Sequence, residues 1–295
     1  MAMEIREVHE EMIAPVKKFL GDREGFRDQN EWDGLFNYLW KLQGYPYGYA
    51  ILDQGEMVGF LGTIFSERVI AGTKRICCNT TSWFVEDKYR AQMLPLRLFA
   101  PILRMKDLLI TNLSPTVRAG EICKAMGYQY LDQEQVVVPV IPGLASMLGI
   151  GRRNIVFSFE PSEIQSHLNP DEQQIFADHR NLPCKHFLIK ERTGEYCYGI
   201  ATSNPMAKFR HLKGNWLNIC YLSNSVVFAR AFPLIKKALW TEGRFFVLRY
   251  DARFFSSKIS QIAVRRSKLR QYKSKEAVPS PIDNIYSELV TFNKY

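Results

Sequence analysis

The order of elements in this chain is set by residues 74–131, which read KRICCNTTSWFVEDKYRAQMLPLRLFAPILRMKDLLITNLSPTVRAGEICKAMGYQYL. Lys74 to Val85 is rich in β-branched and aromatic residues, a composition typical of a half-buried strand. After the polar loop EDKYRAQ, apolar residues recur at helical spacing from Leu94 to Met105. The stretch therefore predicts a strand, a polar loop and a helix in direct succession.

A second strand and a second helix follow without a break. Asp107 to Leu113 is an apolar strand by composition, and Ser114-Pro115 is expected to supply the cap and the first residue of the next helix. That helix is predicted to end at Met126, because Gly127 is a typical helix-terminating residue. Tyr128 to Leu131 then resumes an extended segment.

The junction before Leu94 is suited to an anion. The first turn of a helix has N–H groups without intrahelical partners and carries the positive end of the helix dipole. A strand-loop-helix junction is therefore a natural phosphate site, and Arg90 adds a positive charge to it.

This order of elements resembles the GNAT superfamily of acyl-CoA-dependent N-acyltransferases. Members have a strand, a pyrophosphate loop of pattern R-x-x-G-x-G/A, a helix, a strand and a helix that closes on Gly-Phe. Here Arg90 matches the arginine and Gly127-Tyr128 matches the closing pair. Ala91, Met93 and Pro95 stand in the part of the loop where small residues let the backbone approach the phosphates, so this loop departs from the pattern.

The resemblance implies an acyl-CoA donor, acetyl-CoA or another acyl-CoA, and a small-molecule amine acceptor such as an amino sugar or an amino acid. Backbone N–H groups near the end of the first strand would stabilise a tetrahedral intermediate. The cofactor-binding residues that it implies are Phe84, Val85, Arg90, Ala91, Gln92, Met93, Leu94, Asn112 and Thr116.

Two catalytic residues follow from the resemblance. Many members carry a tyrosine four residues before the closing glycine, and Cys123 stands there, either as a weaker proton donor or as a small buried residue. A carboxylate near the strand ends would take the proton of the amine. Glu67 is the first choice, ahead of Glu86 and Asp87, although each is also readable as a solvated loop charge.

Composition limits the class of protein. The chain has 295 residues, 46% of them hydrophobic, which is enough for two globular domains. No apolar run reaches membrane-spanning length and the N-terminus lacks the apolar core of a secretory signal, so we expect a cytoplasmic protein without a membrane span. The six cysteines show no C-x-x-C pair and are expected to be reduced core thiols rather than disulfides or metal ligands.

The first half is predicted to contain more than the central stretch. Residues 11–20 and 31–42 have apolar residues at helical spacing, and Asp53-Gln54-Gly55-Glu56 is typical of a hairpin turn between two strands. Residues 135–141 supply a last strand. The proline- and glycine-rich segment 142–153 is the expected linker, so the predicted domains are residues 1–141 and 154–295.

The second half repeats this order. Strands at 154–159, 185–190, 196–201, 216–222 and 245–250 are predicted around helices at 171–181 and 225–241. Landmarks in three elements shift together: Gly55 to Gly194 is 139 residues, Pro95 to Pro233 is 138, and Leu108 to Phe245 is 137. We therefore expect an α/β, mixed-sheet fold of two tandem GNAT-like domains. The second lacks the arginine and glycines of the loop.

Three readings of function remain open. The formal charge of +9 and the basic run 265–275 suit an anionic partner and allow an aminoacyl-tRNA-dependent transferase, although nucleic acid is not favoured over CoA. The departures from the loop pattern allow a non-catalytic binding module. Cys184 and His186 lie two apart on a predicted strand, and we read them as structural rather than as a nucleophile pair. Residues 285–292 alternate apolar and polar residues and are predicted to complete the second sheet as a final strand.

Overall fold

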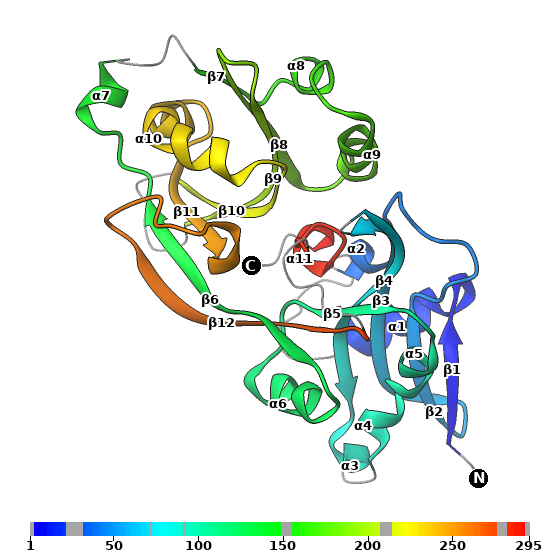
Figure 1. The fold of residues 1–295 in the computed structure, drawn as a ribbon. Helices are drawn as coiled ribbons and strands as arrows, with labels where there is room; N and C mark the ends of the chain where they lie inside the picture. Colours follow the sequence, from blue (N-terminus) through cyan, green and yellow to red (C-terminus); the bar gives the residue numbers. More distant parts are fainter. Residues whose placement is uncertain are drawn as a thin grey trace. The chain divides into compact units, whose positions relative to one another are not determined.

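The computed structural model describes residues 3–21, 32–70, 72–90, 93–148, 155–206, 214–275 and 282–292. The chain forms two compact units, which are described one at a time (Figure 1). Unit 1 comprises Met1–Leu131, Leu269–Ile282 and Tyr286–Phe292, and unit 2 comprises Asp132–Lys268, Asp283–Ile285 and Asn293–Tyr295.

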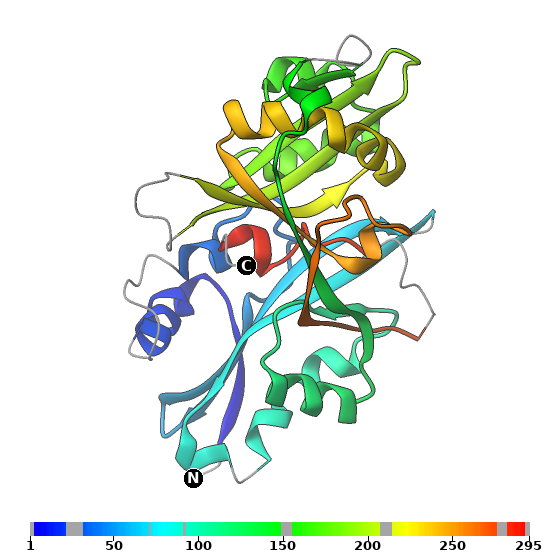
Figure 2. The same cartoon turned by 90° about the vertical axis from the view of Figure 1, so that its left-hand side faces the viewer.

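Unit 1 is built on a mixed sheet. Its strands are β1 (Glu4–Val8), β2 (Gly48–Asp53), β3 (Glu56–Ile70), β4 (Thr73–Val85), β5 (Leu109–Asn112) and the end of β12 (Val264–Lys273), hydrogen-bonded in that order. The pairs from β1 to β4 are antiparallel, β4 and β5 are parallel, and β12 is antiparallel to β5. Figure 2 shows β3 and β4 as two long blue-cyan ribbons side by side. The predicted strand Lys74–Val85 and the hairpin turn at Gly55 are confirmed.

The helices of unit 1 are short. They are η1 (Glu10–Met12), α1 (Ile13–Gly21), α2 (Asp33–Phe36), α3 (Asp87–Arg90), α4 (Leu94–Arg97), α5 (Ala100–Arg104), α6 (Val117–Ala125) and α11 (Glu288–Thr291). The single helix predicted from Leu94 to Met105 is wrong, because Pro101 has no N–H to bond the Arg97 carbonyl and the chain breaks into α4 and α5. Of the helix predicted over 31–42, only α2 forms within the described residues.

One buried core joins these elements. Leu94, Leu98 and Ile102 pack with Phe65 of β3 and Cys78 of β4. The predicted apolar face of the segment 94–105 is therefore confirmed, even though the segment is not one helix.

Unit 2 holds a second sheet with the same kinds of elements. Its strands follow the order β6 (Gln129–Pro139), β11 (Phe245–Asp251), β10 (Asn215–Leu222), β9 (Tyr196–Pro205), β8 (Cys184–Glu191) and β7 (Ile155–Ser158). β10 and β11 are parallel and the other pairs are antiparallel. Its helices are α7 (Leu144–Met147), α8 (Pro161–Gln165), α9 (Pro170–His179), α10 (Ser225–Thr241) and η4 (Ala252–Phe254). Helix α10 has the predicted bounds and lies on the core of this sheet.

The units do not follow the boundaries expected from the sequence. The strand expected to end the first half belongs from Asp132 onward to unit 2, where Gln135–Pro139 pairs with β11. The segment 142–148 contains α7, and residues 149–154 of the expected linker lie outside the described residues.

The end of the chain also differs from expectation. The final strand predicted over 285–292 is wrong, since this segment forms α11. The sheet completed by the tail is the one in unit 1, where Gln271–Lys273 pairs with β5. The basic run is strand β12, and its Arg270 is fully buried and donates to the Leu113 carbonyl oxygen rather than facing solvent.

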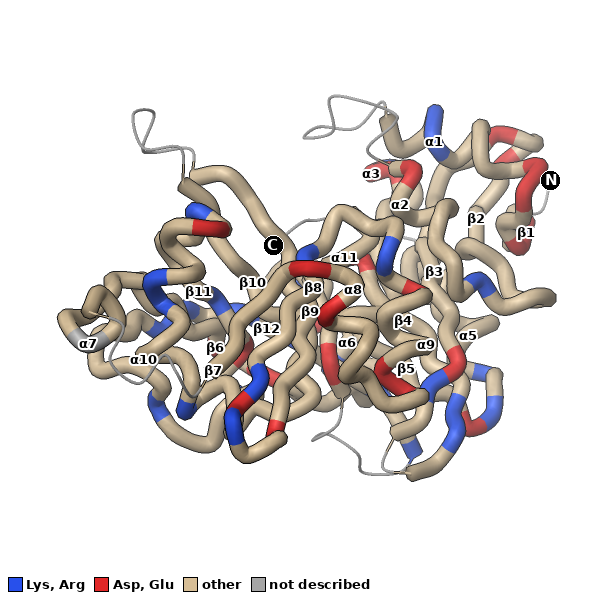
Figure 3. The backbone as a smooth tube through the Cα atoms, turned by 90° about the horizontal axis from the view of Figure 1, so that it is seen from above, with Lys and Arg blue, Asp and Glu red and all other residues tan. Residues whose placement is uncertain are grey.

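Charge and apolar surface agree with a globular protein. In Figure 3 the Lys and Arg positions are spread over many elements and mixed with Asp and Glu. Within the described ranges, no helix has the length and apolar character that crossing a bilayer requires. The six cysteines are free thiols, and five of them are buried.

Candidate active site in unit 1

The parallel strands β4 and β5 separate inside unit 1. Their ladder pairs Cys77 with Leu109, Cys78 with Ile110 and Asn79 with Thr111. Beyond Asn79, β4 continues to Val85, whereas β5 ends at Asn112. Among the described residues, the main chain of β4 from Thr80 to Val85 has no strand partner on the β5 side.

Side chains hold the last rung before the strands part. The Asn79 Nδ2 donates to Thr111 Oγ1 at 3.2 Å, and the Thr80 Oγ1 donates to the Thr111 carbonyl oxygen at 3.1 Å. All three residues are buried. The opening between the strands therefore begins at a fixed point.

A bulge in β4 changes the direction of the strand within this opening. The β3–β4 register shifts between Phe60 and Gly62, which pair with Phe84 and Thr81. Ser82 lies in the bulge with φ of 51°, a left-handed conformation that non-glycine residues rarely adopt. Bulges turn main-chain groups away from the ladder, and this one lies where the predicted cofactor residues Phe84 and Val85 begin.

The predicted phosphate loop is partly described. Arg90 ends α3, where its Nε donates to the Val85 carbonyl oxygen at 2.8 Å and its guanidinium pairs with Asp87 at 2.7 Å. Met93 is the N-cap of α4 with φ of 58°, and its side chain is exposed. Leu94 is buried in the core. Ala91 and Gln92 lie outside the described residues.

The helix-dipole argument for this loop has to be corrected. α4 has four residues, Leu94–Arg97, because of the break before α5. A helix of one turn aligns few peptide dipoles, so the loop does not provide the positive helix end that the sequence predicted. What the described residues place there is the Arg90 guanidinium, itself shared with Val85 and Asp87.

Asn112, Thr116 and Cys123 come together on the α6 side of the opening. The Asn112 Nδ2 contacts the Cys123 Sγ at 3.4 Å, and Cys123 is fully buried. Burial raises the pKa of the Cys123 thiol, while the Asn112 contact opposes that rise. Thr116 caps α6 by accepting from the Ala119 N–H at 3.2 Å. The prediction of Ser114 as the cap is therefore wrong.

The three candidate carboxylates from the sequence lie at exposed or half-buried positions. Glu67 is on β3, paired in register with Ile76, and its carboxylate contacts the Lys74 Nζ at 2.7 Å. Asp87 pairs with Arg90, and Glu86 lies 3.7 Å from the Lys88 Nζ.

A fourth carboxylate was missed by the sequence reasoning. Glu288, the first residue of α11, is 3% exposed. Its Oε1 accepts from the Ser114 hydroxyl at 2.5 Å, and its N–H donates to the Asn79 Oδ1 at 3.3 Å. Burial raises the pKa of the Glu288 carboxyl, opposed by the Ser114 hydrogen bond and the positive charge of Arg270. Glu288 thus lies beside the last β4–β5 rung, and the alternation read as a strand hid it.

Unit 2 contains the matching strand pair. The β10–β11 ladder ends at Asn218 with Arg249, while β10 continues to Leu222, and its register with β9 shifts between Ile219 and Tyr221. Here the opening is filled by the chain itself, because the Asn284 N–H donates to the Cys220 carbonyl oxygen at 3.0 Å.

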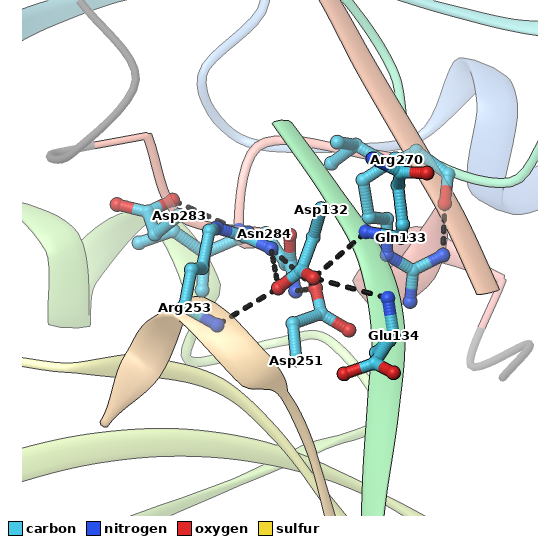
Figure 4. Close-up of polar contacts among 10 residues, drawn as sticks. Asp132, Gln133, Glu134, Asp251, Arg253, Arg270, Asp283 and Asn284 are labelled. Carbon is cyan, nitrogen blue, oxygen red and sulfur yellow. Dashed lines mark hydrogen bonds and ion pairs between the residues drawn. The ribbon is translucent and has the colours of Figure 1, made fainter. Parts of the chain in front are cut away.

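A buried polar network holds that filling segment (Figure 4). The Asn284 Nδ2 donates to Asp251 at 2.8 Å, and its Oδ1 accepts from the Arg253 guanidinium at 2.6 Å. Arg253 also pairs with Asp251 at 2.6 Å and donates its N–H to Asp132 at 2.8 Å. Asn284 and Asp251 are fully buried.

Cys184 and His186 lie together in unit 2, as their spacing predicts. The Cys184 Sγ is 3.6 Å from His186 Nε2, and the Tyr198 hydroxyl is 2.7 Å from His186 Nδ1. Both line an open depression of about 830 Å³. Burial raises the pKa of Cys184 to about 12 and lowers the pKa of His186 to about 4, so both are neutral near pH 7 and form no thiolate-imidazolium pair.

Solved structures give the fold a name. A GCN5-related N-acetyltransferase from Anabaena variabilis superposes with a TM-score of 0.58 at 12% identity, covering 92% of this chain and 73% of that one. One from Kribbella flavida gives 0.57 at 12% identity, covering 92% and 71%. This chain has the GNAT fold. The N-myristoyltransferase of Saccharomyces cerevisiae, solved with myristoyl-CoA and inhibitors, gives 0.51 at 10% identity, covering 97% and 86%.

The GNAT fold is shown by these structures alone, since their sequence identity is low. No family model matches the sequence, and no curated protein matches it. The resemblance inferred from the element order of residues 74–131 is confirmed at the level of the fold.

Proposed function

We propose that this protein is an acyl-CoA-dependent N-acyltransferase whose unit 1 binds the acyl-CoA. The observation that carries the proposal is the opening between β4 and β5 beyond the Asn79–Thr111 rung, in a chain of GNAT fold. The pantetheine arm of CoA has two amide groups. An extended chain with amides can pair with the free edge of a strand, as a peptide does when it extends a sheet.

The residues around the opening have distinct proposed roles. The main chain of Phe84 and Val85, beside the bulge, would hold the thioester carbonyl, where N–H groups stabilise the developing oxyanion. Arg90 and the loop through Ala91, Gln92, Met93 and Leu94 would face the diphosphate, and Asn112 and Thr116 would border the arm. Cys123 is the proposed proton donor to the leaving thiolate, and Glu67 is a proposed proton acceptor.

The reaction class follows from this geometry. The amine nitrogen attacks the thioester carbonyl carbon, the tetrahedral intermediate collapses, and the C–S bond breaks. The protein contributes positioning and oxyanion stabilisation rather than a covalent nucleophile. An acetyl group on a small-molecule amine, such as an amino sugar or an amino acid, is the proposed pair of substrates, and cytoplasm is the proposed location.

Calorimetry with acetyl-CoA tests the proposal. We expect one molecule bound per chain, with S-acetyl-pantetheine binding more weakly at the same site and competing with it. Absence of heat at millimolar acetyl-CoA, with protein shown to be folded by circular dichroism, would reject the proposal. Binding of two molecules would reject the assignment to unit 1 alone.

A further inference from the structure

Glu288 is a buried carboxylate beside the opening in unit 1. Its main-chain N–H bonds the Asn79 side chain, and Asn79 belongs to the last rung before β4 and β5 separate. Its Oε1 accepts from Ser114, two residues beyond the end of β5. Contacts with both strands therefore fix this carboxylate at the start of the opening.

The second oxygen of this carboxylate has no partner among the described residues. Glu288 Oε2 is buried from solvent and receives no hydrogen bond. Leaving a buried polar atom unpaired is costly, and such atoms in a native protein call for an explanation. Since Oε1 is held by Ser114, Oε2 is the oxygen available to a donor that the protein alone does not supply.

Two hydroxyl groups on the same face of unit 1 have the same deficit. Ser66 Oγ on β3 and Thr291 Oγ1 on α11 are buried and without a partner within the described ranges. Ser66 pairs in register with Cys77, two residues before Asn79, so it lies on the face of the sheet that Asn79 presents to Glu288. A carboxylate and hydroxyls together suit a primary amine, which brings several N–H donors and exchanges a proton.

We propose that the Glu288 carboxylate receives the primary amine of the acceptor and takes the proton that its nitrogen loses on attacking the thioester. This inference rests on the proposed acyl transfer. The nitrogen lone pair forms the N–C bond, the C–S electron pair leaves with sulfur, and the proton taken by Glu288 passes to the CoA thiolate. Amide, CoA thiol and the original carboxylate result.

The charged group that acts on Glu288 is Arg270, which is fully buried and donates to the Leu113 carbonyl oxygen. Its positive charge favours the carboxylate, as does the Ser114 hydroxyl, whereas burial favours the neutral acid. A base held between these opposing effects titrates above the ordinary range of a glutamate, nearer to the working pH. Ser114 acts as a positioning residue, since it touches only Glu288.

The test compares Glu288→Gln, Glu288→Asp and Glu121→Gln. Glu121 is an exposed carboxylate on α6 and serves as the matched control. The probes are acetyl-CoA with glucosamine, lysine and spermidine. We expect Glu288→Gln to lower kcat by about 10²-fold with the acetyl-CoA dissociation constant within about twofold of wild type, the loss typical of a missing general base. Glu288→Asp should restore part of the rate, and Glu121→Gln should leave it unchanged.

The pH profile separates catalysis from structure. In wild type, kcat should rise with pH as Glu288 loses its proton, and this acidic limb should be absent in Glu288→Gln. Ser114→Ala removes a hydrogen bond that lowers the pKa, so its limb should move to higher pH. If wild type acetylates an amine and Glu288→Gln keeps both rate and limb, the inference fails while acyl transfer stands. If wild type binds no acetyl-CoA, acyl transfer fails and the inference with it; transfer to none of the three amines also rejects it.

Discussion

The two units contain the same strand pair in two different states. In unit 1, β4 and β5 part after Asn79–Thr111, and within the described residues no main chain pairs with β4 beyond that rung. In unit 2, β10 and β11 part after Asn218–Arg249, but Asn284 donates its N–H to the Cys220 carbonyl oxygen inside the opening. One opening can take a ligand that pairs like a strand, and the other already has one.

The likeness of the two pairs supports an internal repeat. Asn79 and Asn218 end their ladders 139 residues apart, and Ser82 and Cys220, in the bulges, are 138 apart. These are the offsets that the sequence landmarks gave. We propose that the halves are copies of one GNAT-like domain in which a segment of the chain has replaced the cofactor in the second copy.

Removing Arg253 should have the largest effect. It is 14% exposed and pairs with Asp251, Asp132 and the Asn284 side chain in unit 2. Arg253→Ala leaves buried carboxylates without their cation, which costs about 3–5 kcal/mol. Urea unfolding should show this loss in the free energy of unfolding.

Arg230→Ala is the matched control for that experiment. Arg230 also contacts two carboxylates, Glu191 and Glu195, but it is exposed on α10. Its replacement should change the urea midpoint little, because solvent screens surface pairs. If Arg253→Ala and Arg230→Ala unfold at the same urea concentration, the network does not hold the filling segment.

The second prediction concerns the loop of unit 1. Arg90→Ala should weaken acetyl-CoA binding about tenfold, a loss of about 1.4 kcal/mol, since it removes the cation nearest the expected diphosphate. Arg104→Ala, an exposed arginine at the end of α5, is the control and should leave affinity unchanged. Titration calorimetry at two salt concentrations checks both, and equal affinities would remove Arg90 from the site.

Local pattern predicted the elements of both halves because the determinants are local. Composition alone gave β4, and residue spacing alone gave α10 with its bounds. The break between α4 and α5 was readable from Pro101, but the apolar spacing, which core packing preserves, masked it.

Long-range pairing could not be predicted in the same way. Whether β12 joins β5 or the second sheet depends on contacts more than 150 residues apart, as in the Gln271–Asn112 pair. The missed site residue has the same origin. Glu288 acquires its meaning from Asn79 and Ser114, which no pattern around residue 288 contains.

The third prediction uses the stability of unit 1. Burial raises the pKa of Glu288 above 4.5, so the folded protein holds this proton more tightly than the unfolded chain. Its contribution to stability is present at low pH and is lost as pH rises through the folded pKa. Glu288→Gln should therefore match wild type near pH 4.5 and exceed it in Tm at higher pH by roughly 2–4 °C, as about 1 kcal/mol gives. Thermal melts between pH 4.5 and 8 check this; a Tm of Glu288→Gln below that of wild type at pH 8 would contradict it, and Glu121→Gln should show no gap.

The smallest effect is expected at Cys123. Its thiol stays protonated at neutral pH because burial raises its pKa, and Asn112 contacts its sulfur. A proton donor serves best when its pKa is near or below that of the group it protonates. A thiol with a pKa above the ordinary 8.5 or so of a free thiol is therefore a poor acid toward another thiolate. Cys123→Ala should lower kcat by no more than about threefold, measured by release of CoA thiol. A loss near 10²-fold would show that this thiol does donate the proton, and that unit 1 uses a buried acid where unit 2 has no cofactor to protonate.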